Sequence, residues 1–294
     1  MDRIAASAES LAEIDSFQVQ SQYVRIGGVR THYVTAGTGP PVVLLAGLAS
    51  SVRASWRRVL PALAESFRVF AVELPGQGDS EVPAREYTFE YGMEALAEFL
   101  DALRLEAVNL VGASAGGLVA LGTALRYPKR VERLVLIDSV GFGREITWGL
   151  RLATLPLVGE LAAMPKRWLI MRTLRQNFVD SSCISDDLVE EFYRVRKRPG
   201  VKAATLSVLR NGVTLKGIRP SFVLRDQLHR VQAPTLIIWG DKDKVLPLAH
   251  AFIGQSSIPN ARLHIIRDAG HDPVTEQPME VASVVKGFLQ CSPV

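Results

Sequence analysis

The sequence predicts an α/β protein with a mostly parallel central sheet and helices on both of its faces. Short, continuous apolar runs that end in glycine or a turn are typical of strands buried on both faces. These runs alternate with amphipathic helical patterns, as they do in parallel sheets. With 294 residues, 48% of them apolar, the chain can also bury a large core without disulfide bonds.

The predicted elements follow one another in regular order. A short amphipathic helix is expected over 4–16 and a hairpin over 23–34, turning at Gly27-Gly28. Buried strands are predicted at 40–47, 67–76, 107–114, 130–139, 233–240 and 261–268. Helices are predicted at 56–65, at 88–103 and at 278–289, and a further helix is predicted to begin directly after Ser114.

The alternation stops over 140–226, which contains no convincing buried strand and has mainly helical patterns. We therefore expect a core formed by 1–139 and 227–294, with 140–226 inserted as a helical cap.

Composition excludes several classes of function. A net charge of +4, spread along the chain, does not indicate nucleic-acid binding, and neither a zinc-ligand spacing nor a Walker loop is present. No apolar stretch predicts a signal peptide or a membrane span. Two cysteines, Cys183 and Cys291, are expected to be free thiols, which fits a cytoplasmic protein.

The strongest local signal is Gly112-Ala113-Ser114-Ala115-Gly116, which fits G-x-S-x-G between a predicted strand and a predicted helix. In this context the serine occupies a tight, strained turn, and Gly112 and Gly116 leave room for the neighbouring backbone. The turn exposes the hydroxyl at the carboxyl edge of the sheet, where ligands bind in open α/β sheets. Ser114 is therefore the predicted nucleophile.

A serine nucleophile needs a base, and His271 is the predicted one because its loop follows the last strand at the same sheet edge. Among the other histidines, the strand positions of His32 and His264 predict structural roles. Solvated side chains are expected at His229 and His250.

The base in turn needs a carboxylate to orient it. Asp243, on the loop after strand 233–240, is the first candidate, Asp138 at the end of strand 130–139 is the alternative, and Asp241 ranks last. The oxyanion needs two backbone amide donors, which we assign to Ala115 and to Leu48 on the loop after strand 40–47.

From about Tyr23 to Leu289 the chain resembles the alpha/beta-hydrolase superfamily, in its capped, serine-esterase-like branch. The motifs that carry the resemblance are VVLLAG, ELPGQGDS, VGASAGGLVAL, LIIWGDKDKVLP and AGHDPVTEQP. The resemblance implies the chain order Ser114, Asp243, His271 for the triad, the amides of Leu48 and Ala115 for the oxyanion hole, and a cap that selects the substrate.

Two positions depart from the usual family pattern. Ala46 stands where histidine usually precedes the glycine of the oxyanion loop, and Glu73 stands where aspartate is usual. The first change bears on the packing of the oxyanion loop, and the second is expected to be structural.

The cap segment ISDDLVEEFYRVRKRPG also resembles that of carbon–carbon bond hydrolases that act on ring-cleavage products. Those enzymes usually carry asparagine before the nucleophile and arginine in this helix, where the chain has Ala113 and Phe192. The sequence therefore favours hydrolysis of a carboxylic ester, lactone or thioester of a small apolar substrate. Carbon–carbon bond hydrolysis is the alternative, and a catalytically weak small-molecule-binding member of the fold is a second alternative.

The cap is basic: residues 144–226 contain 15 Lys and Arg against 8 Asp and Glu. Solvated arginines on ordinary cap helices are the simplest interpretation. The sharper interpretation is a pocket mouth that favours apolar acyl chains or makes a weak contact with an anionic membrane. The predicted reaction needs no metal ion or cofactor, and the sequence predicts no particular oligomeric state.

Overall fold

The computed structural model describes residues 19–291. The helix predicted over 4–16 lies outside the described residues.

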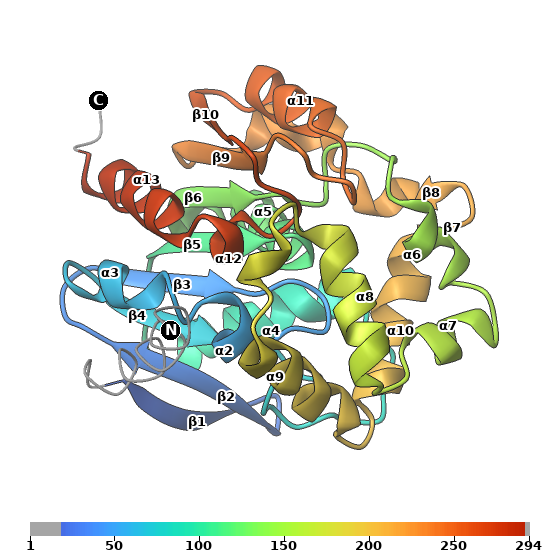
Figure 1. The fold of residues 1–294 in the computed structure, drawn as a ribbon. Helices are drawn as coiled ribbons and strands as arrows, with labels where there is room; N and C mark the ends of the chain where they lie inside the picture. The colour runs from blue at the N-terminus through green and yellow to red at the C-terminus, as the bar shows by residue number, and fades with distance from the viewer. Residues whose placement is uncertain (1–18, 292–294) are drawn as a thin grey trace, which may run out of the picture.

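The described strands form an eight-stranded sheet in the order β1-β2-β4-β3-β5-β6-β9-β10 (Figure 1). The strands are β1 (Gln20–Ile26), β2 (Val29–Ala36), β3 (Pro41–Leu45), β4 (Arg68–Val72), β5 (Val108–Ala113), β6 (Val131–Ile137), β9 (Thr235–Gly240) and β10 (Ala261–Ile266). Within this sheet, only the β1–β2 and β2–β4 pairs are antiparallel. The α/β class with a mostly parallel sheet is therefore confirmed, as is the hairpin at Gly27-Gly28.

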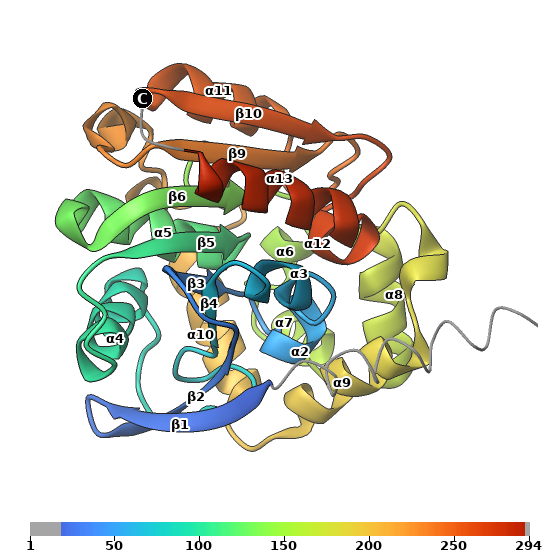
Figure 2. The ribbon, with the colours of Figure 1, turned by 90° about the vertical axis from the view of Figure 1, so that its left-hand side faces the viewer.

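Helices cover both faces of the sheet, because alternate strand residues enter two separate apolar clusters (Figure 2). On one face lie α4 (Phe89–Ala102), α5 (Ala115–Arg126) and α11 (Ala249–Ser257). On the other lie α2 (Val52–Ser55), α3 (Leu60–Ala64), α12 (Pro273–Glu276) and α13 (Pro278–Gln290). Neighbouring β3 residues show the alternation: Val43 packs in the first cluster and Val42 in the second.

Between β6 and β9 the chain is mainly helical. Its α-helices are α6 (Trp148–Leu152), α7 (Val158–Ala162), α8 (Arg167–Asn177), α9 (Asp186–Lys197) and α10 (Val201–Gly212). A hairpin of β7 (Val213–Thr214) and β8 (Gly217–Ile218) follows, whose two-residue strands are too short to leave an alternating sequence pattern. The cap boundaries at 140 and 226 stay a prediction.

Two expectations were wrong. The helix predicted over 56–65 is shorter: α3 begins only at Leu60, with Pro61 in its first turn, and 56–59 form a turn. A separate helix, α2, begins at Val52, before the predicted segment, and is capped by the Ser51 hydroxyl. His250 is 1% exposed rather than solvated. It packs edge-on against Trp239 and forms a hydrogen bond with Glu145 at 2.9 Å, contacts made by residues distant in sequence.

Both cysteines are free thiols, as expected. None of the helices within 19–291 is long and apolar enough to cross a membrane.

Candidate active site

Ser114 lies at the turn between β5 and α5 with φ 52° and ψ −117°, a backbone conformation that L residues rarely adopt. The flanking glycines are required by close packing. A Cβ on Gly112 would lie 2.5 Å from the Gly116 carbonyl oxygen, and a Cβ on Gly116 would lie 2.5 Å from that of Ala46. The turn therefore brings the serine hydroxyl and the oxyanion loop together.

A continuous hydrogen-bonded chain joins three of the residues singled out from the sequence. Ser114 Oγ lies 2.9 Å from His271 Nε2, and His271 Nδ1 lies 2.8 Å from Asp243 Oδ2. Ser114 directly follows β5, and the loops of Asp243 and His271 follow β9 and β10. The three side chains thus meet at the carboxyl edge of the parallel strands.

Asp243 is held rigidly on its loop. Its side chain is fully buried, and its second oxygen, Oδ1, accepts hydrogen bonds from the amides of Val245 at 2.7 Å and Leu246 at 3.0 Å. The carboxylate can therefore fix the tautomer of His271 so that Nε2 faces the serine as an acceptor.

The alternative acids do not contact His271 in the described structure. Asp138 is fully buried and accepts a hydrogen bond from the Gly240 amide at 3.0 Å, whereas its Oδ2 has no partner among the described residues. Burial, together with the nearby charge of Asp243, raises the pKa of Asp138 well above its ordinary value. Asp138 is thus suited to a neutral structural carboxyl, and Asp241 has one buried oxygen without a hydrogen bond in the described chain.

Two backbone amides flank the serine. Gly47 is close enough that a Cβ there would lie 3.3 Å from the Ser114 Cβ, and Leu48 follows it; Ala115 is the first residue of α5. Within 19–291, neither the Leu48 nor the Ala115 amide donates to another protein atom. This is the arrangement that an oxyanion hole requires.

The histidine loop is hydrogen-bonded to the end of α8, a connection that the sequence did not predict. The His271 amide donates to the Asn177 carbonyl at 2.8 Å. Glu276 accepts from the Gly270 amide at 2.7 Å and, through its other oxygen, from the amides of Val179 and Asp180. Glu276 belongs to the AGHDPVTEQP motif, but nothing in the sequence pairs it with a segment almost one hundred positions away.

Asp272 places a second carboxyl directly beside the base. Burial raises the pKa of Asp272 to about 6, against hydrogen bonds from Thr275 that favour its ionised form. Its oxygens accept from the Thr275 amide and hydroxyl at the start of α12. This carboxyl therefore titrates near neutral pH next to His271.

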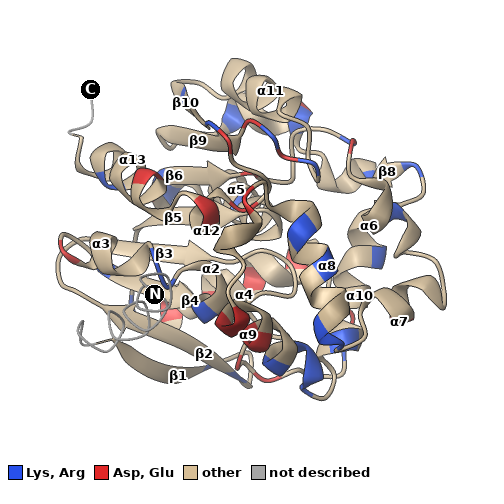
Figure 3. Ribbon diagram, viewed as in Figure 1, with Lys and Arg blue, Asp and Glu red and all other residues tan. Residues whose placement is uncertain are grey.

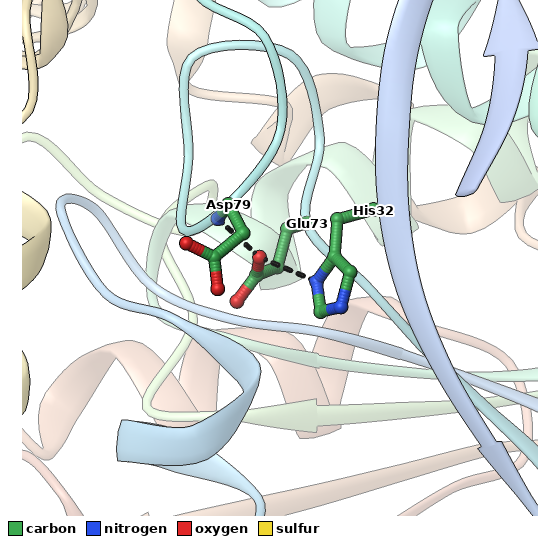
Figure 4. Close-up of side chains that lie close together, drawn as sticks. All are labelled: His32, Glu73 and Asp79. Carbon is green, nitrogen blue, oxygen red and sulfur yellow. Dashed lines mark hydrogen bonds and ion pairs between the residues drawn. The ribbon is translucent and has the colours of Figure 1, made fainter. Parts of the chain in front are cut away.

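Glu73 is the centre of a buried network, shown in Figure 4 with His32 and Asp79. Its carboxylate accepts from the Val52 amide and the Asp79 amide, and it lies 2.8 Å from His32 Nδ1. Asp79 is bound by both terminal nitrogens of Arg194 on α9. Burial opposes ionisation of Asp79, but the Arg194 hydrogen bonds outweigh it and lower the Asp79 pKa.

The potential metal ligands of this network are already occupied. Both His32 ring nitrogens, both Glu73 oxygens and both Asp79 oxygens have protein partners. The network therefore fits a structural junction between core and cap better than an ion site, in line with the structural role expected for Glu73.

A cavity of about 90 Å³ leads away from the two amides. Its wall includes Leu48 and Ala115 and extends to Val208 on α10 and to Phe222. None of the described residues that line it is charged. The cavity therefore suits an apolar group attached to a carbonyl bound at the amides.

Comparison with known proteins now places the chain in a family. A family model described as alpha/beta hydrolase fold matches residues 40–278. The chain belongs to the alpha/beta hydrolase fold family. The curated 2-hydroxy-6-oxo-2,4-heptadienoate hydrolase of Pseudomonas putida F1 is 34% identical to this alpha/beta hydrolase over 90% of the chain and 95% of the relative.

Solved structures of hydrolases are also similar to it. A meta-cleavage product hydrolase from Pseudomonas fluorescens IP01 has a TM-score of 0.80 and 28% identity, covering 91% of this chain and 97% of that one. A bacterial membrane phospholipase A has a TM-score of 0.81 and 25% identity, covering 97% and 90%.

Proposed function

We propose that this alpha/beta hydrolase is a serine hydrolase of carbonyl substrates that cleaves a carbon–carbon bond in a ring-cleavage dienoate. The observation that carries the proposal is the hydrogen-bonded chain Ser114–His271–Asp243 opposite two free amides. The choice of bond is supported by the relative from P. putida, whose name specifies a heptadienoate substrate. This proposal reverses the expectation of ester hydrolysis that rested on Ala113 and Phe192 alone.

In the proposed reaction the 2-hydroxydienoate first tautomerises: its enol proton moves to the chain carbon of the scissile bond, so that the remaining double bond is conjugated with the new 2-oxo group. Ser114 Oγ then attacks the ketone carbon at the other end of the scissile bond while His271 Nε2 accepts the serine proton. The Leu48 and Ala115 amides stabilise the resulting oxyanion. Collapse of this intermediate breaks the carbon–carbon bond. Its electron pair passes into the conjugated dienolate, and the proton from His271 is delivered to that fragment. Water, deprotonated by His271, then releases the acid and restores Ser114.

A dienoate also requires a site for its carboxylate. Phe192 stands where related carbon–carbon hydrolases usually carry arginine, but Arg196 lies one turn further along α9, with its Cζ 5.9 Å from the Phe192 ring centroid. Burial lowers the pKa of Arg196, and no acid pairs with it within the described chain. Arg196 does not line the cavity of about 90 Å³. We therefore propose that the carboxylate end of the substrate extends beyond this cavity toward α9, where Arg196 supplies the positive charge that recognises it.

Ester hydrolysis is the second candidate, because the same attack on a carbonyl serves both reactions. Two observations favour it: the uncharged cavity beside Leu48 and Ala115, and the similarity to a structure named as a phospholipase A. Ala113 also lacks the amide group expected before the nucleophile of a carbon–carbon hydrolase.

A competition between substrates decides between the two. The purified protein is assayed with 2-hydroxy-6-oxo-dienoates and with p-nitrophenyl esters of graded chain length. Carbon–carbon hydrolysis predicts a kcat/KM for the dienoate at least about tenfold above that for the best ester, equivalent to about 1.4 kcal/mol in barrier. Turnover of esters alone would assign the ester reaction instead.

Arg196→Gln, compared with Lys197→Gln on the exposed side of α9, tests the carboxylate site. We expect R196Q to raise KM for the dienoate about tenfold or more and to leave neutral esters unchanged, since a buried charge-assisted contact contributes more than a solvated one. Equal effects of R196Q and K197Q would assign Arg196 no role in recognition.

A catalytically weak binding protein remains the third interpretation. A fluorophosphonate probe that labels the wild-type protein but not Ser114→Ala supports an active nucleophile, and an unlabelled wild-type protein would favour binding alone. The cytoplasmic location predicted from the cysteines stays a prediction.

A further inference from the structure

Large apolar side chains are exposed on one part of the cap. Six of them lie within residues 148–168 and are each more than 40% exposed: Trp148, Leu152, Leu157, Val158, Leu161 and Trp168. We call these six residues the cap patch. They lie on α6, α7 and the start of α8, which Figure 1 shows together at the right-hand edge of the molecule, away from the sheet.

Leu157 does not serve packing. It is 76% exposed, the highest value among the exposed large apolar side chains of the described residues. It also has φ 65°, in the left-handed region that favours glycine or asparagine. A strained leucine that projects into solvent at the start of α7 gains nothing from the fold of the isolated chain.

The charges around the cap patch are almost all of one sign. Between 148 and 175 the chain carries Arg151, Lys166, Arg167, Arg172 and Arg175, with Glu160 as the only acid. Figure 3 shows this basic character along α8. Glu160 is already paired with Arg210 at 2.8 Å, and Arg167 is paired with Glu190 at 2.6 Å. Within 19–291 neither Lys166 nor Arg172 has an ion-pair partner.

We propose that the cap patch docks the protein on an anionic phospholipid surface. Its leucines and valine would enter the boundary of the acyl chains, and Trp148 and Trp168 would lie at the level of the headgroups, where tryptophan is enriched. Lys166 and Arg172 would contact the lipid phosphates. A second copy of this chain fits less well, because a symmetric contact through the patch would bring these positive charges together.

The tryptophans provide a direct readout. The chain has four: Trp56 and Trp239 are fully buried, whereas Trp148 and Trp168 are 64% and 66% exposed. Docking should therefore shift the fluorescence of the exposed pair to shorter wavelength without unfolding. The full-length protein is mixed with phosphatidylcholine vesicles that contain or lack phosphatidylglycerol, at low and at high salt.

We expect co-sedimentation with the anionic vesicles at low salt to exceed that with neutral vesicles by about tenfold or more, and to fall at high salt because exposed charges are screened. Leu157→Asn and Trp168→Gln should each reduce binding severalfold. Asparagine tolerates positive φ, so L157N is expected to fold normally. The matched control is Met279→Asn, which removes an equally exposed apolar side chain from α13 on the core.

Three outcomes would overturn the proposal. One is the absence of binding to anionic vesicles at low salt, and another is an equal loss of binding in M279N and L157N. The third is a wild-type dimer in sedimentation velocity that W168Q dissociates, which would assign the patch to contacts between copies.

Discussion

Two Ser–His–carboxylate chains with nearly equal distances occur within residues 19–291. In the candidate triad, His271 lies 2.9 Å from Ser114 Oγ and 2.8 Å from Asp243. In a second set, which we call the strand triad, His32 lies 2.8 Å from Ser21 Oγ and 2.8 Å from Glu73. By hydrogen bonds alone the two sets cannot be told apart.

They differ in the backbone around the serine. Ser21 lies in edge strand β1, paired in regular register opposite Val34, and is exposed. Ser114 lies on a strained turn at the start of a helix, near the Leu48 and Ala115 amides, which donate to no other protein atom within 19–291. We therefore expect turnover from Ser114 and not from Ser21, because Ser114 adjoins backbone amides that can stabilise an oxyanion, whereas Ser21 is paired within a strand.

Replacing the serine of each triad should give the largest difference between the two triads. We expect Ser114→Ala to lower kcat on the order of 10⁶-fold, as in other triad hydrolases, and Ser21→Ala to leave it within about twofold. Steady-state kinetics on the preferred substrate and fluorophosphonate labelling measure both. A comparable loss in S21A would mean that the strand triad takes part in turnover.

Replacing the candidate carboxylates should give the next largest difference in kcat. Asp243→Asn should lower kcat about 10⁴-fold, because His271 would be held in the wrong tautomer. Asp138→Asn is the matched control: its raised pKa indicates a neutral carboxyl, which asparagine resembles in shape. We expect D138N to retain most activity. A larger loss in D138N than in D243N would transfer the orienting role to Asp138.

Glu73→Gln should affect stability rather than turnover. Glutamine offers one acceptor oxygen where the Glu73 carboxylate now accepts from Val52, Asp79 and His32. A lost partner in a buried network costs about 1–3 kcal/mol, so the free energy of unfolding should fall by that amount while kcat stays within about threefold. Urea unfolding and kinetics, with Glu73→Asp as the charge-retaining control, separate the two effects.

Asp272 should give a smaller, pH-dependent effect. Its pKa of about 6 in the folded state exceeds the value of 3.8 in the unfolded chain, so the folded state binds more protons between these values. Stability contributed by this group is therefore complete below pH 4 and declines as pH rises through 6. Asp272→Asn, which can still cap α12, should flatten that decline in urea unfolding across this range. An unchanged slope would contradict the raised pKa.

Much of the fold could be predicted because the buried strands have continuous apolar sequences. The turn at Ser114 and the loops of Asp243 and His271 were predictable for the same reason, since each directly follows such a strand. His250 was not, because its burial depends on Trp239 and Glu145, which meet it only in the folded protein. The similarity of the strand triad to the candidate triad could not be predicted either, because Ser21 lies near the start of β1 and Glu73 lies directly after β4.

The hydrogen bonds between Glu276 and the segment after α8 limit how caps can be exchanged between hydrolases. A cap transplanted at its two ends, near 140 and 226, would also remove the Asn177 carbonyl and the amides of Val179 and Asp180. The recipient histidine loop would then lose its anchor, and a buried carboxylate would lose two donors. A chimera of this kind would fail through a misplaced base even where its new pocket fits the new substrate, so residues 177–180 belong with the core in any such design.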